Sequence, residues 1–135
     1  MTGYSGAPLN KKLGFKDGFR VFLIDPPSHY LNLLGTDSSQ TISFVNQAEN
    51  LDLVHLFVNT AEGLETQLAV LKTAIKPNGM IWVSWYKKSA KQPTELTEDM
   101  IRATALALGL VDVKVCAVDE QWSGLKLVIR LKDRK

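Results

Sequence analysis

The sequence predicts a three-layer α/β fold, in which helices cover both faces of a mostly parallel sheet that ends in an antiparallel hairpin. Two mostly apolar runs, 21–25 and 53–58, have the pattern of strands that are buried on both faces. A third apolar run, 80–85, follows the longest stretch of helical periodicity. Near the C-terminus, two further runs alternate apolar and polar residues with a period of two, which is typical of an antiparallel pair.

Length and composition favour one compact domain over residues 1–135, with residues 1–18 as an N-terminal extension that contains a short helix. The chain has 45% hydrophobic residues and a net charge of +2, so we expect neither disorder nor a nucleic-acid partner. The single cysteine, Cys116, excludes an intrachain disulfide and a cysteine-based metal site. Because no apolar run approaches roughly 20 residues and no signal-peptide pattern is present, we expect a cytoplasmic protein without a membrane partner.

The first half of the chain contains short elements. In order, they are a helix over 8–13, a strand over 21–25, a short helix after Ser28, a polar loop over 36–40 and a weaker strand over 41–46. Pro8 suits the first turn of a helix and Gly14 its end. Ser28 is expected to cap the second helix, and Gly35 to end it.

The second half contains longer elements. In order, they are a strand over 53–58, a helix capped by Thr60, a break at 77–79, a strand over 80–85, a helix from Thr97 to Gly109, and two strands over 111–117 and 125–131. Leu64, Leu68 and Leu71 recur at helical spacing after Thr60. The last two strands are joined by a predicted loop at 119–124, which makes them a hairpin at one edge of the sheet.

Three segments together resemble the class I, Rossmann-like methyltransferases. They are the strand at 53–58, the helix, turn and strand at 71–83, and the entry to the hairpin at 108–111. The resemblance covers about residues 50–131 and implies a minimal methyltransferase-like Rossmann fold. It also implies glycines after the first strand, where S-adenosylmethionine would bind, and an acidic residue at the end of the second strand.

Nearly the whole chain also resembles a small bacterial family of uncharacterised proteins. The matching strings lie at 3–14, 82–88 and 109–126. Because that family has no established reaction, this resemblance supports the fold and leaves the function open.

The turn after the first strand departs from the methyltransferase pattern. It reads Asp25-Pro26-Pro27-Ser28-His29, and each proline removes a backbone donor and fixes the turn. The second strand is followed by Asn46-Gln47, with Glu49 as a distant acidic candidate. We therefore expect no cofactor. The alternative is a protein that binds S-adenosylmethionine through another contact, such as the segment 3–8 folded over the pocket.

Ligands of open α/β sheets bind beyond the carboxyl ends of the strands, so the candidate residues follow the predicted strands. They are Asp25, Pro26, Ser28, His29, Asn59, Thr60, Trp85, Lys87 and Lys88. The two lysines predict a small anionic ligand that carries a phosphate or a carboxylate, unless they belong to a solvated loop. Trp85 is either a stacking platform or a residue of the core.

The predicted hairpin loop is a second candidate site. Its residues are Asp119, Glu120, Trp122 and Ser123. They fit a polar ligand site, a turn with Trp122 folded over the sheet edge, or a protein contact, because tryptophan is enriched at interfaces. Of the two histidines, His29 is better placed for acid–base chemistry, with Asp25 as its nearest partner, although a helix-start or surface role is favoured. His55 lies inside an apolar strand, which predicts a hydrogen-bonded core residue.

The sequence thus favours a noncatalytic protein that binds a small anionic ligand or a protein partner. One alternative is a divergent S-adenosylmethionine-dependent methyltransferase. Another is a structural homodimer that associates through the hairpin edge or Trp122. An open pocket beside Pro26 would favour ligand binding, whereas an exposed apolar hairpin edge would favour association.

Overall fold

A six-stranded sheet organises the residues that the computed structural model describes, 9–35 and 41–134. Its strands are β1 (Arg20–Ile24), β2 (Ser43–Phe44), β3 (Leu51–Phe57), β4 (Ile75–Tyr86), β5 (Leu110–Ala117) and β6 (Trp122–Ile129). Their order in the sheet is β2-β1-β3-β4-β6-β5. The first four strands pair in parallel, and β6 pairs antiparallel with both β4 and β5. The predicted mostly parallel sheet with an antiparallel hairpin at one edge is therefore confirmed.

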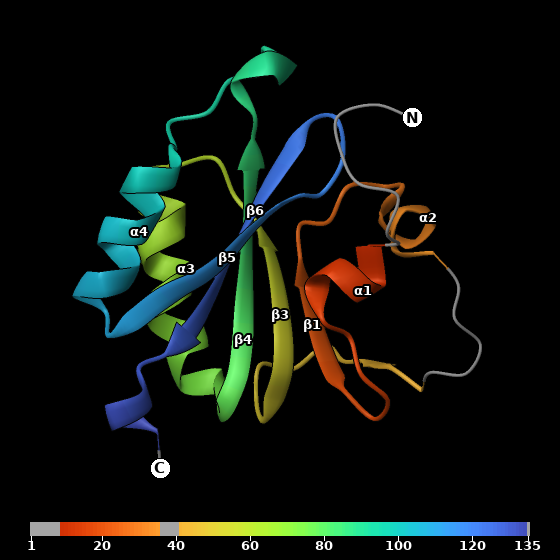
Figure 1. Ribbon diagram of the computed structural model, residues 1–135, viewed down its shortest axis with the longest axis vertical. Helices are drawn as coiled ribbons and strands as arrows, with labels where there is room; N and C mark the ends of the chain where they lie inside the picture. Colours follow the sequence, from red (N-terminus) through yellow and green to blue (C-terminus); the bar gives the residue numbers. More distant parts are fainter. Residues whose placement is uncertain (1–8, 36–40, 135) are drawn as a thin grey trace.

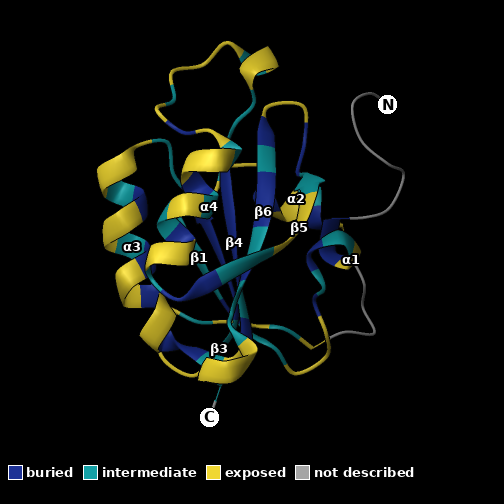
Figure 2. Ribbon diagram, turned by 60° about the vertical axis from the view of Figure 1, so that its left-hand side comes forward, coloured by how far each residue is buried: buried dark blue, intermediate teal, exposed yellow. Residues whose placement is uncertain are grey.

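Helices cover both faces of this sheet, which confirms the predicted three layers (Figure 1). They are α1 (Leu9–Leu13), α2 (Tyr30–Leu34), α3 (Ala61–Ala74) and α4 (Glu98–Ala107). The buried residues of α3 and α4 share a core with Leu56 and Val83, while those of α1 and α2 share a second core with Phe57 and Trp82. Figure 2 shows that the buried residues concentrate in the sheet and on the helix sides that face it.

The two long helices begin at the residues that the sequence predicts. The Thr60 side chain accepts a hydrogen bond of 3.1 Å from the N–H of Gly63. In the same way, Thr97 accepts a bond of 3.2 Å from the N–H of Met100. Each cap satisfies one of the donors that the first turn of a helix leaves unpaired.

The prediction for the start of α2 is wrong. His29, rather than Ser28, occupies the N-cap position, and it makes no capping bond through its side chain. The turn is closed instead by the backbone, because the N–H of Tyr30 donates to the carbonyl of Pro27 at 3.0 Å. Gly35 follows the helix with a φ of 79°, as expected for a glycine that ends a helix. The predicted loop at 36–40 and the helix start at Pro8 lie outside the described residues.

Pro77, Asn78 and Gly79 lie inside β4, so the predicted break before that strand is wrong. The helix α3 already ends at Ala74, and β4 begins with the next residue. Leu51 pairs with Ile75 and Leu53 with Met80. An advance of two residues along β3 therefore corresponds to an advance of five residues along β4. The three extra residues form a bulge, which accommodates a proline that a regular central strand excludes.

A second bulge changes which side chains of β5 face the core. Asp112 pairs with Leu127 and Lys114 with Lys126, which leaves Val113 as an extra residue. The bulge reverses the alternation along the strand, so the uninterrupted period of two that the sequence predicts for this strand is wrong. Both Val113 and Val115 are about half exposed, at 52% and 49%. Homodimerisation through this edge stays a prediction.

The hairpin loop is shorter than predicted because β6 already begins at Trp122. Only 118–121 separate the two strands, and β6 ends at Ile129 rather than at Leu131, which is 78% exposed. Within the described ranges, each helix falls short of the length and apolarity that crossing a bilayer requires. The single-domain organisation and the extension over 1–18 stay predictions.

Candidate functional site

A cavity of about 510 Å³ lies at the carboxyl ends of β1 and β3. The chain leaves these neighbouring parallel strands toward opposite faces of the sheet, into α2 and α3, which makes this place a topological switch point. The volume lies within the range of small-molecule sites, which is roughly 300–1,000 Å³. The lining residues are Asp25, Pro27, Leu56, Phe57, Val58, Asn59, Thr60, Gly63, Gln67, Tyr86 and Trp122.

Asp25 sits at the end of β1 in a conformation that an aspartate seldom adopts. Its φ is 53°, in the left-handed region, and Pro26 follows it. Such a residue stores about 1–2 kcal/mol of backbone strain, which natural proteins retain most often at functional sites. Among the described residues that line the cavity, Asp25 carries the only full charge. The cavity therefore suits a cationic ligand or a neutral ligand that offers hydroxyl groups.

An aromatic wall closes one side of the cavity. Trp122 and Tyr86 are paired across β6 and β4, and their rings stack with centroids 4.2 Å apart. Phe57 meets Trp122 edge to face at 4.9 Å. Because Trp122 is only 8% exposed, its ring belongs to the wall and to the core behind it. The sequence predicts a loop at Trp122, whereas this residue is the first of β6.

Asn59 and Thr60 are brought to the cavity as predicted, and both are held by structural hydrogen bonds. The side-chain oxygen of Asn59 accepts from the N–H of Tyr86 at 2.9 Å, which ties the ends of β3 and β4 together. Thr60 caps α3, and Glu95 accepts from the N–H of Ala61 at 2.9 Å beside it. The carboxylate of Glu95 already occupies the positive end of the α3 dipole, so an anion is not favoured there.

Lys87, Lys88 and Trp85 do not line the cavity. The backbone of Lys87 binds the carbonyl of Gln121 at 2.8 Å, and Lys88 begins the short 3-10 turn Lys88–Ala90. Trp85 is 6% exposed and belongs to the core under α3 and α4, so it is no stacking platform. Among the described residues, the cavity therefore has no lysine or arginine in its lining.

The structure joins two candidate residues that are 90 positions apart in the sequence. Nε2 of His29 lies 3.0 Å from Oδ2 of Asp119. The other oxygen of Asp119 accepts from the N–H groups of Gln121 and Trp122, both at 2.8 Å. Asp119, rather than Asp25, is thus the partner of His29, and it also shapes the turn that leads into the aromatic wall.

The remaining candidates lie around the cavity rather than in it. Pro26 and Ser28 are exposed in the turn after β1, where Pro27 supplies the cavity wall. Glu120 is exposed in the hairpin turn, and Ser123 lies in β6 opposite Trp85. Within the described ranges, no three or more His, Cys, Asp or Glu side chains are grouped so that they could hold a metal ion.

The sequence did not single out several lining residues, among them Leu56, Phe57 and Val58 at the end of β3 and Gly63 and Gln67 on α3. Phe57 is the last residue of β3, two positions before the predicted site residue Asn59. Gly63 and Gln67 lie four residues apart on α3, so they share the helix face above the strand ends. Their spacing from the predicted cap at Thr60 is the signal that could have identified them.

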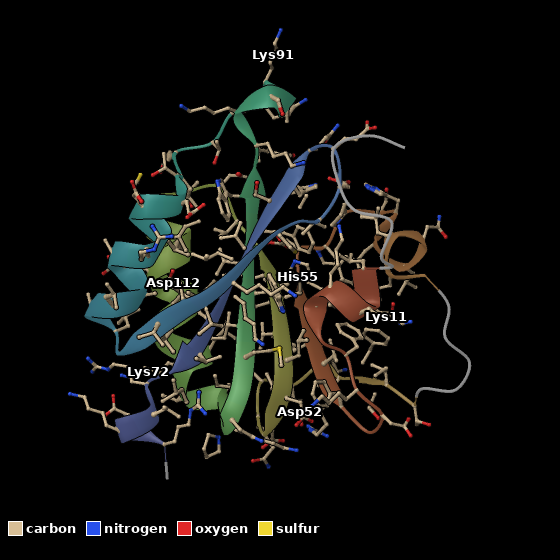
Figure 3. The ribbon with its side chains drawn as sticks, in the orientation of Figure 1. Lys11, Asp52, His55, Lys72, Lys91 and Asp112 are labelled. Atoms are coloured by element: carbon tan, nitrogen blue, oxygen red, sulfur yellow. The ribbon has the colours of Figure 1, made fainter. Side chains whose placement is uncertain are left out.

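A buried hydrogen-bonded network that includes His55 lies next to Phe57 of the aromatic wall. His55 is labelled in Figure 3. Its imidazole bonds the hydroxyl of Tyr30 at 2.8 Å through Nδ1 and that of Ser84 at 2.7 Å through Nε2. The imidazole also stacks on Phe57 with centroids 4.3 Å apart. The three polar residues are 2% exposed or less, which agrees with the core role predicted for His55.

The burial of His55 makes the protein less stable in acid. Desolvation lowers the pKa of His55 from 6.5 to about 3. Between these pH values, His55 is protonated in the unfolded chain and neutral in the folded chain. The contribution of neutral His55 to the free energy of unfolding is therefore complete above pH 6.5, and it decreases as the pH falls toward 3. We expect the free energy of unfolding to fall by about 2 kcal/mol more in the wild type than in His55→Gln between about pH 7 and about pH 5. Urea unfolding at both pH values measures this difference, and parallel losses in the two proteins would contradict it.

Solved structures of known proteins share the fold of this chain. A methyltransferase from Aquifex aeolicus that depends on S-adenosylmethionine superposes with a TM-score of 0.61 at 14% identity, over 89% of this chain and 87% of that chain. A second one, from Clostridium acetobutylicum, has a TM-score of 0.55 at 8% identity, over 90% and 87% of the two chains. The magnesium protoporphyrin IX methyltransferase of Synechocystis, solved with bound S-adenosylhomocysteine, has a TM-score of 0.58 at 10% identity, over 90% and 78%.

This chain has the fold of the class I methyltransferases. A scan against protein-family models finds no match, and neither does a search of the curated proteins. At such low sequence identity, the methyltransferase fold carries no residue-level function with it. The function therefore depends on the residues that line the cavity of this chain.

Proposed function

We propose that this protein binds S-adenosylmethionine in the cavity between β1, β3 and α3, and that it is a divergent methyltransferase. One observation carries the proposal. The cavity lies at the switch point of a methyltransferase fold, and its one charged lining group among the described residues is the carboxylate of Asp25. This reverses the preference that the sequence alone supports, because the anionic ligand expected there meets a carboxylate instead of lysines.

The lining residues fit the chemical groups of this cofactor. A carboxylate at Asp25 accepts hydrogen bonds from ribose hydroxyls or faces a positive sulfonium or ammonium group. The wall of Phe57, Tyr86 and Trp122 supplies apolar aromatic surface suited to an adenine ring. Gln67 and Thr60 add side-chain donors and acceptors on the opposite side.

The prolines of the turn set a limit on how the cofactor is held. Neither Pro26 nor Pro27 has an N–H group, so this turn cannot offer two successive backbone donors to a carboxylate. The carboxylate of the cofactor must therefore bind elsewhere. The segment 3–8 remains the predicted contact, and it lies outside the described residues.

Bound S-adenosylmethionine would supply an electrophilic methyl group. The part of the chain described here would position that group and limit the access of water, because Phe57 and Trp122 shield one side of the cavity. A transfer reaction depends chiefly on such positioning, since the reacting atoms must be held close together in line.

A noncatalytic binding protein is the second candidate function. Besides Asp25, the lining among the described residues holds no histidine, lysine, cysteine or glutamate that could remove a proton from an acceptor. Ligand binding without turnover therefore also fits the cavity. Incubation with S-adenosylmethionine labelled in its methyl group, together with candidate acceptors, separates the two functions.

Titration calorimetry on Asp25→Asn tests the proposal directly. We expect wild-type protein to bind S-adenosylmethionine with a dissociation constant of about 1–100 μM, and the variant about tenfold more weakly. A sulfonium neighbour would make this loss larger for S-adenosylmethionine than for S-adenosylhomocysteine, whereas a ribose neighbour would make the losses equal. Glu65→Gln, which removes an exposed carboxylate of α3 outside the lining, is the matched control. Absent binding by the wild type, or equal binding by Asp25→Asn, would contradict the proposal.

A further inference from the structure

Two lysines face each other on the sheet side that α1 covers. Lys114 of β5 and Lys126 of β6 are directly paired across the antiparallel ladder, so their side chains project from the same face. On its other side, Lys126 pairs with Trp82, whose ring N–H donates to the carbonyl of Leu13 at the end of α1. These contacts place the lysine pair beside the C-terminal end of α1.

A third lysine, Lys16, lies in the turn after α1, three residues beyond Leu13, whose carbonyl is bound by Trp82, the strand neighbour of Lys126. The positive charges of Lys114 and Lys16 both act on Lys126, and together with burial, which is the largest cause, they lower its pKa. The ammonium of Lys114 also lies 3.4 Å from the carbonyl of Lys12. We call Lys16, Lys114 and Lys126 the lysine cluster.

The lysine cluster has an unfavourable arrangement in the isolated chain. Like charges that face each other across two strands destabilise a sheet, and Lys126 is also partly withdrawn from water. Among the described residues, none of the ion pairs involves a lysine of the cluster. A chain with a net charge of only +2 nevertheless concentrates three positive charges here.

We propose that the lysine cluster is a binding site for a phosphate group. A phosphate carries up to two negative charges and several acceptor oxygens, so it can neutralise more than one ammonium group of the cluster, whereas a single carboxylate neutralises one. The carbonyl of Lys12 and the buried indole of Trp82 fix the position of the site on rigid elements. The lysine cluster, rather than Lys87 and Lys88, would thus bind the predicted anionic ligand.

This site is separate from the cavity. Trp122 at the cavity and Lys126 in the cluster lie four residues apart on β6, which corresponds to roughly 13 Å along a strand. The proposed phosphate site therefore does not depend on the proposed binding of S-adenosylmethionine, and the two proposals can be tested separately. The phosphate group that binds there belongs either to a small phosphorylated ligand or to the backbone of a nucleic acid.

Thermal unfolding in the presence of sodium pyrophosphate tests the site, with sodium chloride at equal ionic strength as the reference. Lys126→Met keeps the length of the side chain and removes the charge. We expect this variant to melt at a higher temperature than the wild type without phosphate, because the repulsion is gone. We also expect it to bind pyrophosphate about tenfold more weakly. Lys114→Met should show both effects as well.

Lys91→Met is the matched control, because Lys91 is an exposed lysine at the far end of the molecule (Figure 3). It should respond to pyrophosphate as the wild type does. A single-stranded oligonucleotide forms a second arm of the experiment. Binding of the oligonucleotide alone, abolished by Lys126→Met, would assign the phosphate to a nucleic acid, and a pyrophosphate response assigns it to a small ligand. No response of the wild type to either, or an equal response in Lys126→Met, would overturn the proposal.

Discussion

Trp122→Ala should destabilise the protein by about 3–5 kcal/mol and abolish ligand binding in the cavity. The ring is 8% exposed, stacks on Tyr86 and meets Phe57 edge to face, so its removal opens a hole between the sheet and the cavity. Urea unfolding measures the loss of stability through the midpoint, provided that the slope of the transition stays unchanged. Titration with S-adenosylmethionine under folding conditions measures the loss of binding.

Trp122→Phe is the control for this prediction. A phenyl ring keeps the stacking on Tyr86 and most of the buried area, so we expect a loss of about 1–2 kcal/mol and partial retention of binding. An interface role for Trp122 makes a different prediction, since the alanine variant would then alter the oligomeric state and leave the stability of the monomer intact. An alanine variant as stable as the wild type would contradict the position of Trp122 in the aromatic wall.

Gly79→Ala should destabilise the protein by about 2–3 kcal/mol, which is a large effect for a single methyl group. A β-carbon at this position would lie 2.8 Å from the carbonyl oxygen of Leu51 and 3.0 Å from that of Lys76. Both neighbours are backbone atoms of the bulge and of β3, so neither can move without disturbing the strand pairing. Because the bulge sets the register of β4, the variant should also weaken ligand binding at Tyr86.

Asn78→Ala provides the comparison for Gly79. This neighbouring residue lies in the same bulge and is exposed, so its substitution should change the free energy of unfolding by no more than about 0.5 kcal/mol. Equal stability of Gly79→Ala and Asn78→Ala would show that the close approach of the two strands is absent. The bulge could then not be the feature that sets the register of β4.

The fold could be predicted from the sequence because the strands and helices carry strong local signals. The apolar run around Val54 and Leu56 has no polar face, and it pairs with parallel strands on both sides. The threonine caps at Thr60 and Thr97 begin their helices at the expected residues. Each of these signals depends on a few neighbouring residues, so local physical chemistry is sufficient to locate them.

The candidate site was harder to predict because its contacts depend on register. The bulge at Val113 reverses the faces of β5, although the sequence around it alternates without interruption. The bond between His29 and Asp119 joins residues from opposite halves of the chain, which no local pattern indicates. Trp122 reads as a loop residue beside Asp119 and becomes part of the aromatic wall only when β6 pairs with β4.

Nuclear magnetic resonance of isotopically labelled protein, titrated with S-adenosylmethionine, tests the central claim most directly. If the cofactor binds at the switch point, the largest shift changes will fall on the amides of Asp25, Asn59, Thr60 and Gly63 and on the indole N–H of Trp122. The amides of Lys114 and Lys126 should change little, because the lysine cluster is a separate site. Changes that cluster away from the cavity, or a spectrum that does not change at millimolar cofactor, would contradict the assignment of this cavity.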